Sequence, residues 1–156
     1  MPIRAFAALT LVATLMAPAA ALVALPAPAS AAEKITLWKT PWCGCCSAWG
    51  EAMSQAGYAV AMRDREDLAP VKAQLGVPDA MASCHTAIIG GYFLEGHVPL
   101  EAVRKLLDER PEIAGLAVPG MPQGSLGMGT DPTARYDVHA VARSGESRVF
   151  HRAGLD

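Results

Sequence analysis

The chain has 156 residues, a formal net charge of −2 and an isoelectric point near 6.1. This length suits one domain with its own hydrophobic core and is short for two. Lysine and arginine do not gather into a basic stripe, so the sequence argues against a nucleic-acid partner.

The N-terminal residues 1–32 are predicted to be a secretory signal peptide. Arg4 is followed by a long apolar run and then by small residues that end at Ala32. This order is typical of a signal that is cleaved, here near Ala31 or Ala32. The alternative is an uncleaved membrane anchor. It is disfavoured because Pro18 and the Ala-Pro repeats leave fewer than the ~20 continuous apolar residues of a spanning helix.

Cleavage would leave a slightly acidic exported domain, residues 33–156. We expect this domain to be periplasmic and not bound to a membrane.

Hydrophobic periodicity predicts short strands and helices along this domain. Gly90-Gly91 separates two apolar runs and indicates a two-residue hairpin. Residues 115–129 are rich in Gly, Pro and Met and are predicted to form an irregular loop. The expected strands are 35–38, 58–62, 86–89, 92–95, 136–141 and 147–151, and the expected helices are 47–56, 68–75 and 100–107.

The order of these elements is strand, helix, strand, helix, hairpin, helix and a final hairpin. It predicts an α/β fold, a mixed sheet flanked by helices, with a small C-terminal β hairpin. This is the element order of a thioredoxin-like domain.

Three of the four cysteines, Cys43, Cys45 and Cys46, fall within four consecutive positions. A structural disulfide gains most by closing a long loop, and a bridge from Cys43 to Cys46 closes almost none. Cys43 is expected where a strand ends and a helix begins, which favours a thiolate, both a nucleophile and a soft metal ligand. The alternative is a local disulfide with one spare thiol.

The fourth cysteine, Cys84, stands just before the predicted strand 86–89. In the expected architecture the loop that carries it lies over the start of the first helix, so four sulfur atoms would converge. Soft thiolates select Cu(I), Zn(II) or iron–sulfur clusters, and the affinity order favours copper. Adjacent cysteines at a helix start cannot both point in one direction. Three thiolates there would therefore bridge several ions more naturally than chelate one.

The cysteine motif is similar to the thioredoxin active-site motif with Cys45 in place of the central proline. More closely, the region from Lys34 to Met128 resembles the CopG-type copper-resistance proteins, a family first described as a domain of unknown function. The resemblance is carried by five stretches: Lys39-Thr40-Pro41-Trp42-Cys43-Gly44-Cys45-Cys46, Ser83-Cys84-His85-Thr86, Gly90-Gly91-Tyr92, Glu95-Gly96-His97-Val98-Pro99 and Gly115-Leu116-Ala117-Val118-Pro119-Gly120-Met121-Pro122.

The resemblance implies a periplasmic, thioredoxin-like protein that holds a cysteine-bridged cluster of copper ions and has a redox role in copper handling. The sulfur ligands would be Cys43, Cys45, Cys46 and Cys84, with His85 and His97 as nearby histidines of the motif. Thioether sulfur from Met121 or Met128 is a further candidate donor to Cu(I).

Two other functions compete with copper binding. A periplasmic thiol–disulfide oxidoreductase would need only Cys43 and Cys46. Cys45 argues against it, as does Cys84 in the region where thioredoxins carry a cis-proline. The other reading is an inert, disulfide-stabilised module. The sequence favours a metal-binding protein over an enzyme; the enzyme considered is a copper-ion oxidoreductase. The candidate partners are copper ions and another periplasmic copper protein.

Overall fold

Seven strands and three helices make up the part of the chain that the structure, a computed structural model, describes, residues 32–154. The predicted signal peptide lies outside the described residues except for Ala32. No helix within residues 32–154 is long and apolar enough to cross a membrane. The strands are β1 (Lys34–Lys39), β2 (Ala59–Asp64), β3 (His85–Ile89), β4 (Tyr92–Glu95), β5 (Gly115–Ala117), β6 (Tyr136–Val141) and β7 (Ser147–Ala153). The helices are α1 (Gly44–Gln55), α2 (Ala69–Leu75) and α3 (Leu100–Glu109), with a short 3-10 helix at Asp79–Met81.

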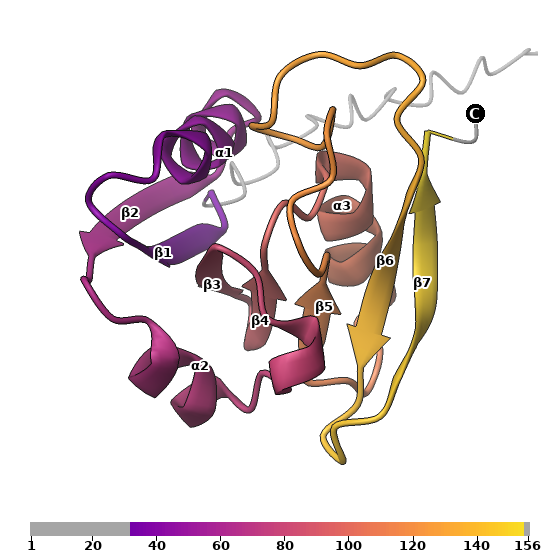
Figure 1. Cartoon of the computed structure of the whole chain (residues 1–156). Helices are drawn as coiled ribbons and strands as arrows, with labels where there is room; N and C mark the ends of the chain where they lie inside the picture. The colour runs from indigo at the N-terminus through magenta and orange to yellow at the C-terminus, as the bar shows by residue number, and fades with distance from the viewer. Residues whose placement is uncertain (1–31, 155–156) are drawn as a thin grey trace, which may run out of the picture. The chain divides into compact units, whose positions relative to one another are not determined.

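The strands form one sheet in the order β2-β1-β3-β4-β5-β6-β7 (Figure 1). β1 pairs with β2 in parallel and with β3 antiparallel, and β4 pairs antiparallel with β3 and parallel with β5. β6 and β7 complete the sheet as an antiparallel hairpin. The predicted fold class, a mixed α/β sheet with helices and a C-terminal hairpin, is confirmed.

The two faces of the sheet bury different side chains, because side chains alternate along each strand. One face packs on α1 and α3, where Trp49 and Leu106 join Leu37, Leu94 and Leu116 in the main core. The opposite face carries a smaller cluster that includes Val77, Phe93 and Val141, with Leu75 of α2 packed against it. A side chain of β3 therefore faces either α1 or α2 according to its position in the strand.

The structure corrects the sequence prediction at β5. Residues 115–117 were expected to belong to an irregular loop, but they form a strand between β4 and β6. Three residues are too few for a recognisable alternation. Gly115 lies so close to Phe93 that a Cβ atom there would be 2.3 Å from the Phe93 carbonyl oxygen. β5 also joins the terminal hairpin to the rest of the sheet, so the hairpin is a continuation of the sheet.

Local signals placed the other elements well. Gly90 and Gly91 both have positive φ, 55° and 89°, and form the predicted two-residue turn between β3 and β4. Asp67 accepts a hydrogen bond from the Ala69 backbone N–H at 2.8 Å just before α2, whose N-cap residue is Leu68. The first helix begins at Gly44, three residues earlier than predicted, which brings two cysteines into its first turn.

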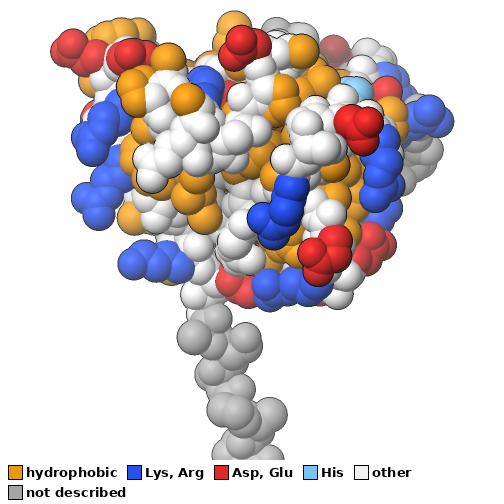
Figure 2. Space-filling view, turned by 90° about the horizontal axis from the view of Figure 1, so that it is seen from below, with side chains coloured by type: hydrophobic (Ala, Val, Ile, Leu, Met, Phe, Trp, Pro, Cys, Tyr) orange, Lys and Arg blue, Asp and Glu red, His pale blue; other side chains and the backbone are white. Residues whose placement is uncertain are grey.

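Figure 2 shows the molecule from below the view of Figure 1, with Lys and Arg side chains interspersed with Asp and Glu around apolar side chains. This view shows no broad surface of one charge.

Candidate metal centre

Three cysteines lie at the start of α1. Cys43 is the N-cap residue, with extended backbone (φ −78°, ψ 93°), and Cys45 and Cys46 lie in the first turn. This is the predicted junction between a strand and a helix, where unpaired N–H groups and the helix dipole favour negative charge. Cys46 is fully buried, whereas Cys43 and Cys45 are half-buried.

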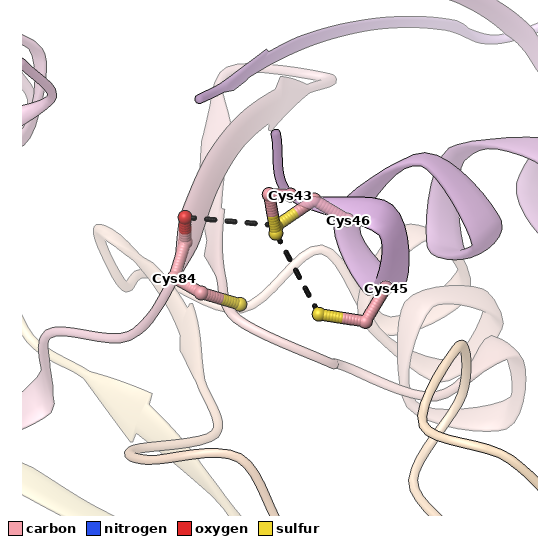
Figure 3. A group of neighbouring side chains, drawn as sticks. All are labelled: Cys43, Cys45, Cys46 and Cys84. Carbon is pink, nitrogen blue, oxygen red and sulfur yellow. Dashed lines mark hydrogen bonds between the residues drawn. A yellow bond between two sulfur atoms is a disulfide. The ribbon is translucent and has the colours of Figure 1, made fainter. Parts of the chain in front are cut away.

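Cys43 and Cys46 are joined by a disulfide, while Cys45 and Cys84 are free. The Cys45 sulfur lies 3.6 Å from that of Cys43 (Figure 3). All four sulfur atoms fall within 4.8 Å of one another. The predicted convergence of the four cysteines is therefore present in the structure. Cys43 and Cys46 are oxidised, as in the alternative prediction of a local disulfide. Only after reduction of this disulfide would the sulfurs of Cys43 and Cys46 be available to a metal ion.

Cys84 reaches the centre from the opposite side, as the residue just before β3. Its carbonyl oxygen lies 3.7 Å from the Cys46 sulfur. Burial, followed by the nearby Cys45, raises the pKa of the Cys84 thiol to about 11. A thiol with such a pKa is protonated at neutral pH, so a metal that binds Cys84 must displace a proton.

His97 is held with one ring nitrogen toward Cys84. Its Nδ1 lies 2.8 Å from the carbonyl oxygen of Leu126, and its Nε2 lies 3.1 Å from the Cys84 sulfur. A carbonyl oxygen can only accept, so Nδ1 carries the proton and donates it. The Nε2 lone pair of the neutral ring therefore faces the Cys84 sulfur. A histidine oriented in this way by a backbone carbonyl is typical of metal sites.

His85 lies on the same side of Cys84. Its Nδ1 is 3.5 Å from the Cys84 sulfur, and its ring packs between those of Trp49 and His97, with centroids at 4.8 and 4.9 Å. Its Nε2 is the one buried side-chain nitrogen or oxygen among residues 32–154 without a hydrogen-bond partner. Burial, together with the charges of His97 and Lys72, lowers the pKa of His85 to about 3. The ring is therefore neutral at physiological pH and able to act as a ligand.

This burial predicts a pH dependence of stability in the metal-free protein. The pKa of His85 is about 3 when folded and near its ordinary value of 6.5 when unfolded. Between these values the unfolded chain binds a proton that the folded protein does not, so stability is lost as the pH falls from 6.5. We expect His85 to contribute up to about 1.4 kcal/mol per pH unit to this slope. Urea unfolding of wild type and His85→Phe from pH 4 to 7 measures how the free energy of unfolding changes with pH. Equal pH dependence in the two proteins would show that His85 is not its source.

The glycine-rich loop after β5 covers the start of α1. Gly127 has φ 87°, and a Cβ atom there would lie 2.7 Å from the Cys45 carbonyl oxygen and 2.8 Å from the Trp49 nitrogen. The sequence predicted only an irregular loop here. It could not show that the carbonyl of the preceding residue, Leu126, accepts a hydrogen bond from His97, because the side-chain pattern carries no information about backbone carbonyl groups. The run of glycines was the available signal for a close approach.

Replacing Gly127 by alanine tests this close contact. Gly145 offers a matched control, because its φ is 89° and no atom lies within 4 Å of a Cβ built there. Gly145→Ala should cost about 1–2 kcal/mol for the left-handed backbone alone. Gly127→Ala should cost more, since the backbone of α1 must also move. Thermal unfolding of both variants measures the loss of stability. Equal losses would show that the loop can move away from α1 at no energetic cost.

Four further candidate side chains carry sulfur or imidazole nitrogen that could bind a metal ion. Met121 is 57% exposed and Met128 is half-buried, and neither is tested as a ligand by the structure. His139 belongs to β6, and His151 of β7 lies 3.6 Å from a Glu101 carboxylate oxygen. These two histidines are half-buried.

The donor set consists of sulfur and imidazole nitrogen. The sulfurs of Cys43, Cys45, Cys46 and Cys84 form one group, and Cys84 with His85 and His97 forms a second that shares Cys84, each group lying within 4.8 Å. Thiolate and imidazole are the ligands that soft and borderline ions such as Cu(I) and Zn(II) prefer. The reduced centre therefore fits a soft metal ion chemically.

Comparison with known proteins agrees with this centre. Residues 81–128, which include Cys84 and both histidines, match the family described as "Protein of unknown function, DUF411". No curated protein matches the chain. Two solved structures match, titled "Copper resistance protein copG", Form 1 and Form 2. Form 1 is 41% identical with a TM-score of 0.72 and covers 76% of this chain and 95% of its own. Form 2 is 40% identical with a TM-score of 0.73, at 78% and 98% coverage. The chain belongs to the CopG family of copper-resistance proteins.

Proposed function

We propose that this protein binds Cu(I) through Cys43, Cys45, Cys46 and Cys84 and acts in copper resistance. The observation that carries the proposal is the approach of the four sulfur atoms to within 4.8 Å of one another. Thiolates bridge soft ions readily, and four sulfurs this close favour a cysteine-bridged cluster of several Cu(I) ions. Both similar structures are of copper resistance proteins, which supports copper over zinc.

His85 and His97 complete the proposed donor set. Each presents a ring nitrogen near the Cys84 sulfur, at 3.5 and 3.1 Å. The bound copper would be the protein's cargo, with a change of copper oxidation state as an associated redox role. The N-terminal signal would deliver the protein to the periplasm, where it would exchange copper with another copper protein. The strand and helix order supports a thioredoxin-like scaffold.

Copper loading tests the proposal. The purified protein is reduced and titrated with Cu(I) under anaerobic conditions, and bound copper is measured after gel filtration. X-ray absorption at the copper edge then identifies the ligands. We expect more than one copper ion per chain with mainly sulfur ligands. His151→Ala, a histidine outside the centre, should load like wild type. Less than one equivalent of copper per chain would overturn the proposal.

A thiol–disulfide oxidoreductase is the second candidate, and the disulfide between Cys43 and Cys46 favours it. Cys43 stands at the N-terminus of α1, where a nucleophilic thiolate is favoured. A third thiol, Cys45, lies 3.6 Å from the Cys43 sulfur and would compete for any mixed disulfide formed there. Insulin reduction by metal-free protein separates the two functions. Rapid turnover that Cys46→Ser abolishes would favour the oxidoreductase.

A further inference from the structure

Glu95 at the end of β4 is a charged residue buried beneath the metal centre. Its side chain has no exposed surface. One carboxylate oxygen accepts hydrogen bonds from the Lys72 ammonium and from the Ser83 backbone N–H, the latter at 2.6 Å. The other accepts from the Thr86 hydroxyl at 2.6 Å, and Lys72 also donates to that hydroxyl at 3.0 Å. The carboxylate is thus fully engaged by three donors.

Two of these donors flank the metal-site residues Cys84 and His85. Ser83 precedes them and Thr86 follows, so the Glu95 carboxylate fixes both ends of this short segment. Because side chains alternate in β3, Thr86 faces α2 while His85 faces α1. The ion pair therefore lies on the opposite face of the sheet from His85.

The same residue also secures the loop that orients His97. The backbone carbonyl of Glu95 accepts a hydrogen bond from Val118 N–H at 2.9 Å. The Ser83 hydroxyl donates to the Gly120 carbonyl in that loop. This loop continues to Leu126, whose carbonyl binds His97 Nδ1. Glu95 is thus connected to both segments that bring donors to the centre from outside α1.

We propose that Glu95, held by Lys72, is a positioning residue that fixes the Cys84 sulfur for metal binding. The stability of the fold alone does not account for a buried ion pair, since apolar residues of similar volume often stabilise a core equally well. A carboxylate, however, can receive a backbone N–H and a hydroxyl from two sides of Cys84 at once. The inference rests on the proposed function, because it assigns Cys84 to metal binding.

A double-mutant cycle tests this coupling. Glu95→Ala removes both oxygens, whereas Glu95→Gln keeps one oxygen that can accept the Ser83 N–H. Each is combined with Cys84→Ala, and Cu(I) affinity is measured by competition with a chromophoric chelator. With Cys84 present, Glu95→Ala should weaken binding by about 10- to 100-fold and Glu95→Gln by much less. With Cys84→Ala, the effect of Glu95→Ala should shrink to about twofold.

Two controls separate positioning from a general loss of structure. Leu106→Ala, at a buried core position of α3, should lower the melting temperature without this dependence on Cys84. If Glu95→Ala does not fold, the isosteric Thr86→Val removes one of the two tethers and is measured in the same cycle. Weakening of equal size with and without Cys84 would overturn the proposal.

A copper-free measurement keeps the two proposals distinct. Hydrogen exchange of the Ser83 amide, followed by NMR in metal-free protein, should be faster in Glu95→Ala than in Glu95→Gln. Unchanged exchange would overturn the tether itself. Failure of the wild type to bind Cu(I) would instead refute the proposed function and with it the metal-binding part of this inference.

Discussion

Replacing Cys45 by proline is expected to lower the copper bound by the reduced protein by about half, because one of four clustered thiolates is lost and a bridged cluster depends on each of them. The helix should tolerate the change. Cys45 lies in the first turn of α1, where backbone N–H groups have no partner within the helix, and Gly44 before it has no Cβ atom to clash with the proline ring. Copper per chain after anaerobic Cu(I) loading is the measurement.

Cys45→Ser is the matched control for the proline ring. It removes the same sulfur without constraining the backbone, so both variants should lose similar amounts of copper. The Cys43–Cys46 disulfide should still form in each, as thiol quantification after mild oxidation would show. If the proline variant loads as much copper as wild type, Cys45 is not a ligand and the three-thiolate cluster is wrong.

Oxidation of Cys43 and Cys46 is expected to lower the Cu(I) capacity of the protein to roughly half or less, since two of the four sulfur donors are then joined to each other. Cys45, Cys84 and His97 remain as a smaller donor set. Titration of the reduced and disulfide forms with Cu(I), each with its free thiols counted beforehand, measures the difference.

The double variant Cys43→Ser/Cys46→Ser serves as the reference for this comparison. It lacks both thiols without containing a disulfide, so its Cu(I) capacity should equal that of the oxidised wild type under reducing and non-reducing conditions alike. Identical capacity in the reduced and oxidised wild type would mean that Cys43 and Cys46 do not bind copper.

Much of the centre could be predicted because its donors lie beside strong local signals. The strand and helix order placed Cys43 at a helix start and Cys84 just before a strand, and the structure brings their sulfur atoms together. The glycine pair at 90–91 fixed the hairpin that returns the chain toward His97. The helix start, the strand start and the turn each depend on residues close in sequence. The approach of Cys84 to Cys43 followed from the order of the elements, which places the loop before β3 over the start of α1.

Other parts depend on contacts that no local pattern records. The strand β5 is defined by its neighbours β4 and β6 and by the absence of room for a side chain at Gly115. Leu126 acts through its backbone carbonyl, and the Lys72–Glu95 pair joins residues 23 positions apart. The oxidation state of Cys43 and Cys46 depends on the redox environment as well as on their proximity.

The complete burial of Cys46 gives the sulfur cluster an inner and an outer side. Cys43, Cys45 and Cys84 keep partial contact with solvent, whereas Cys46 has none. In the proposed site, a Cu(I) ion that arrives by ligand exchange would meet an outer sulfur before Cys46, and an ion that leaves would release Cys46 before the outer sulfurs. Loading and unloading would then follow a fixed order, and an outer thiol would control the rate of both.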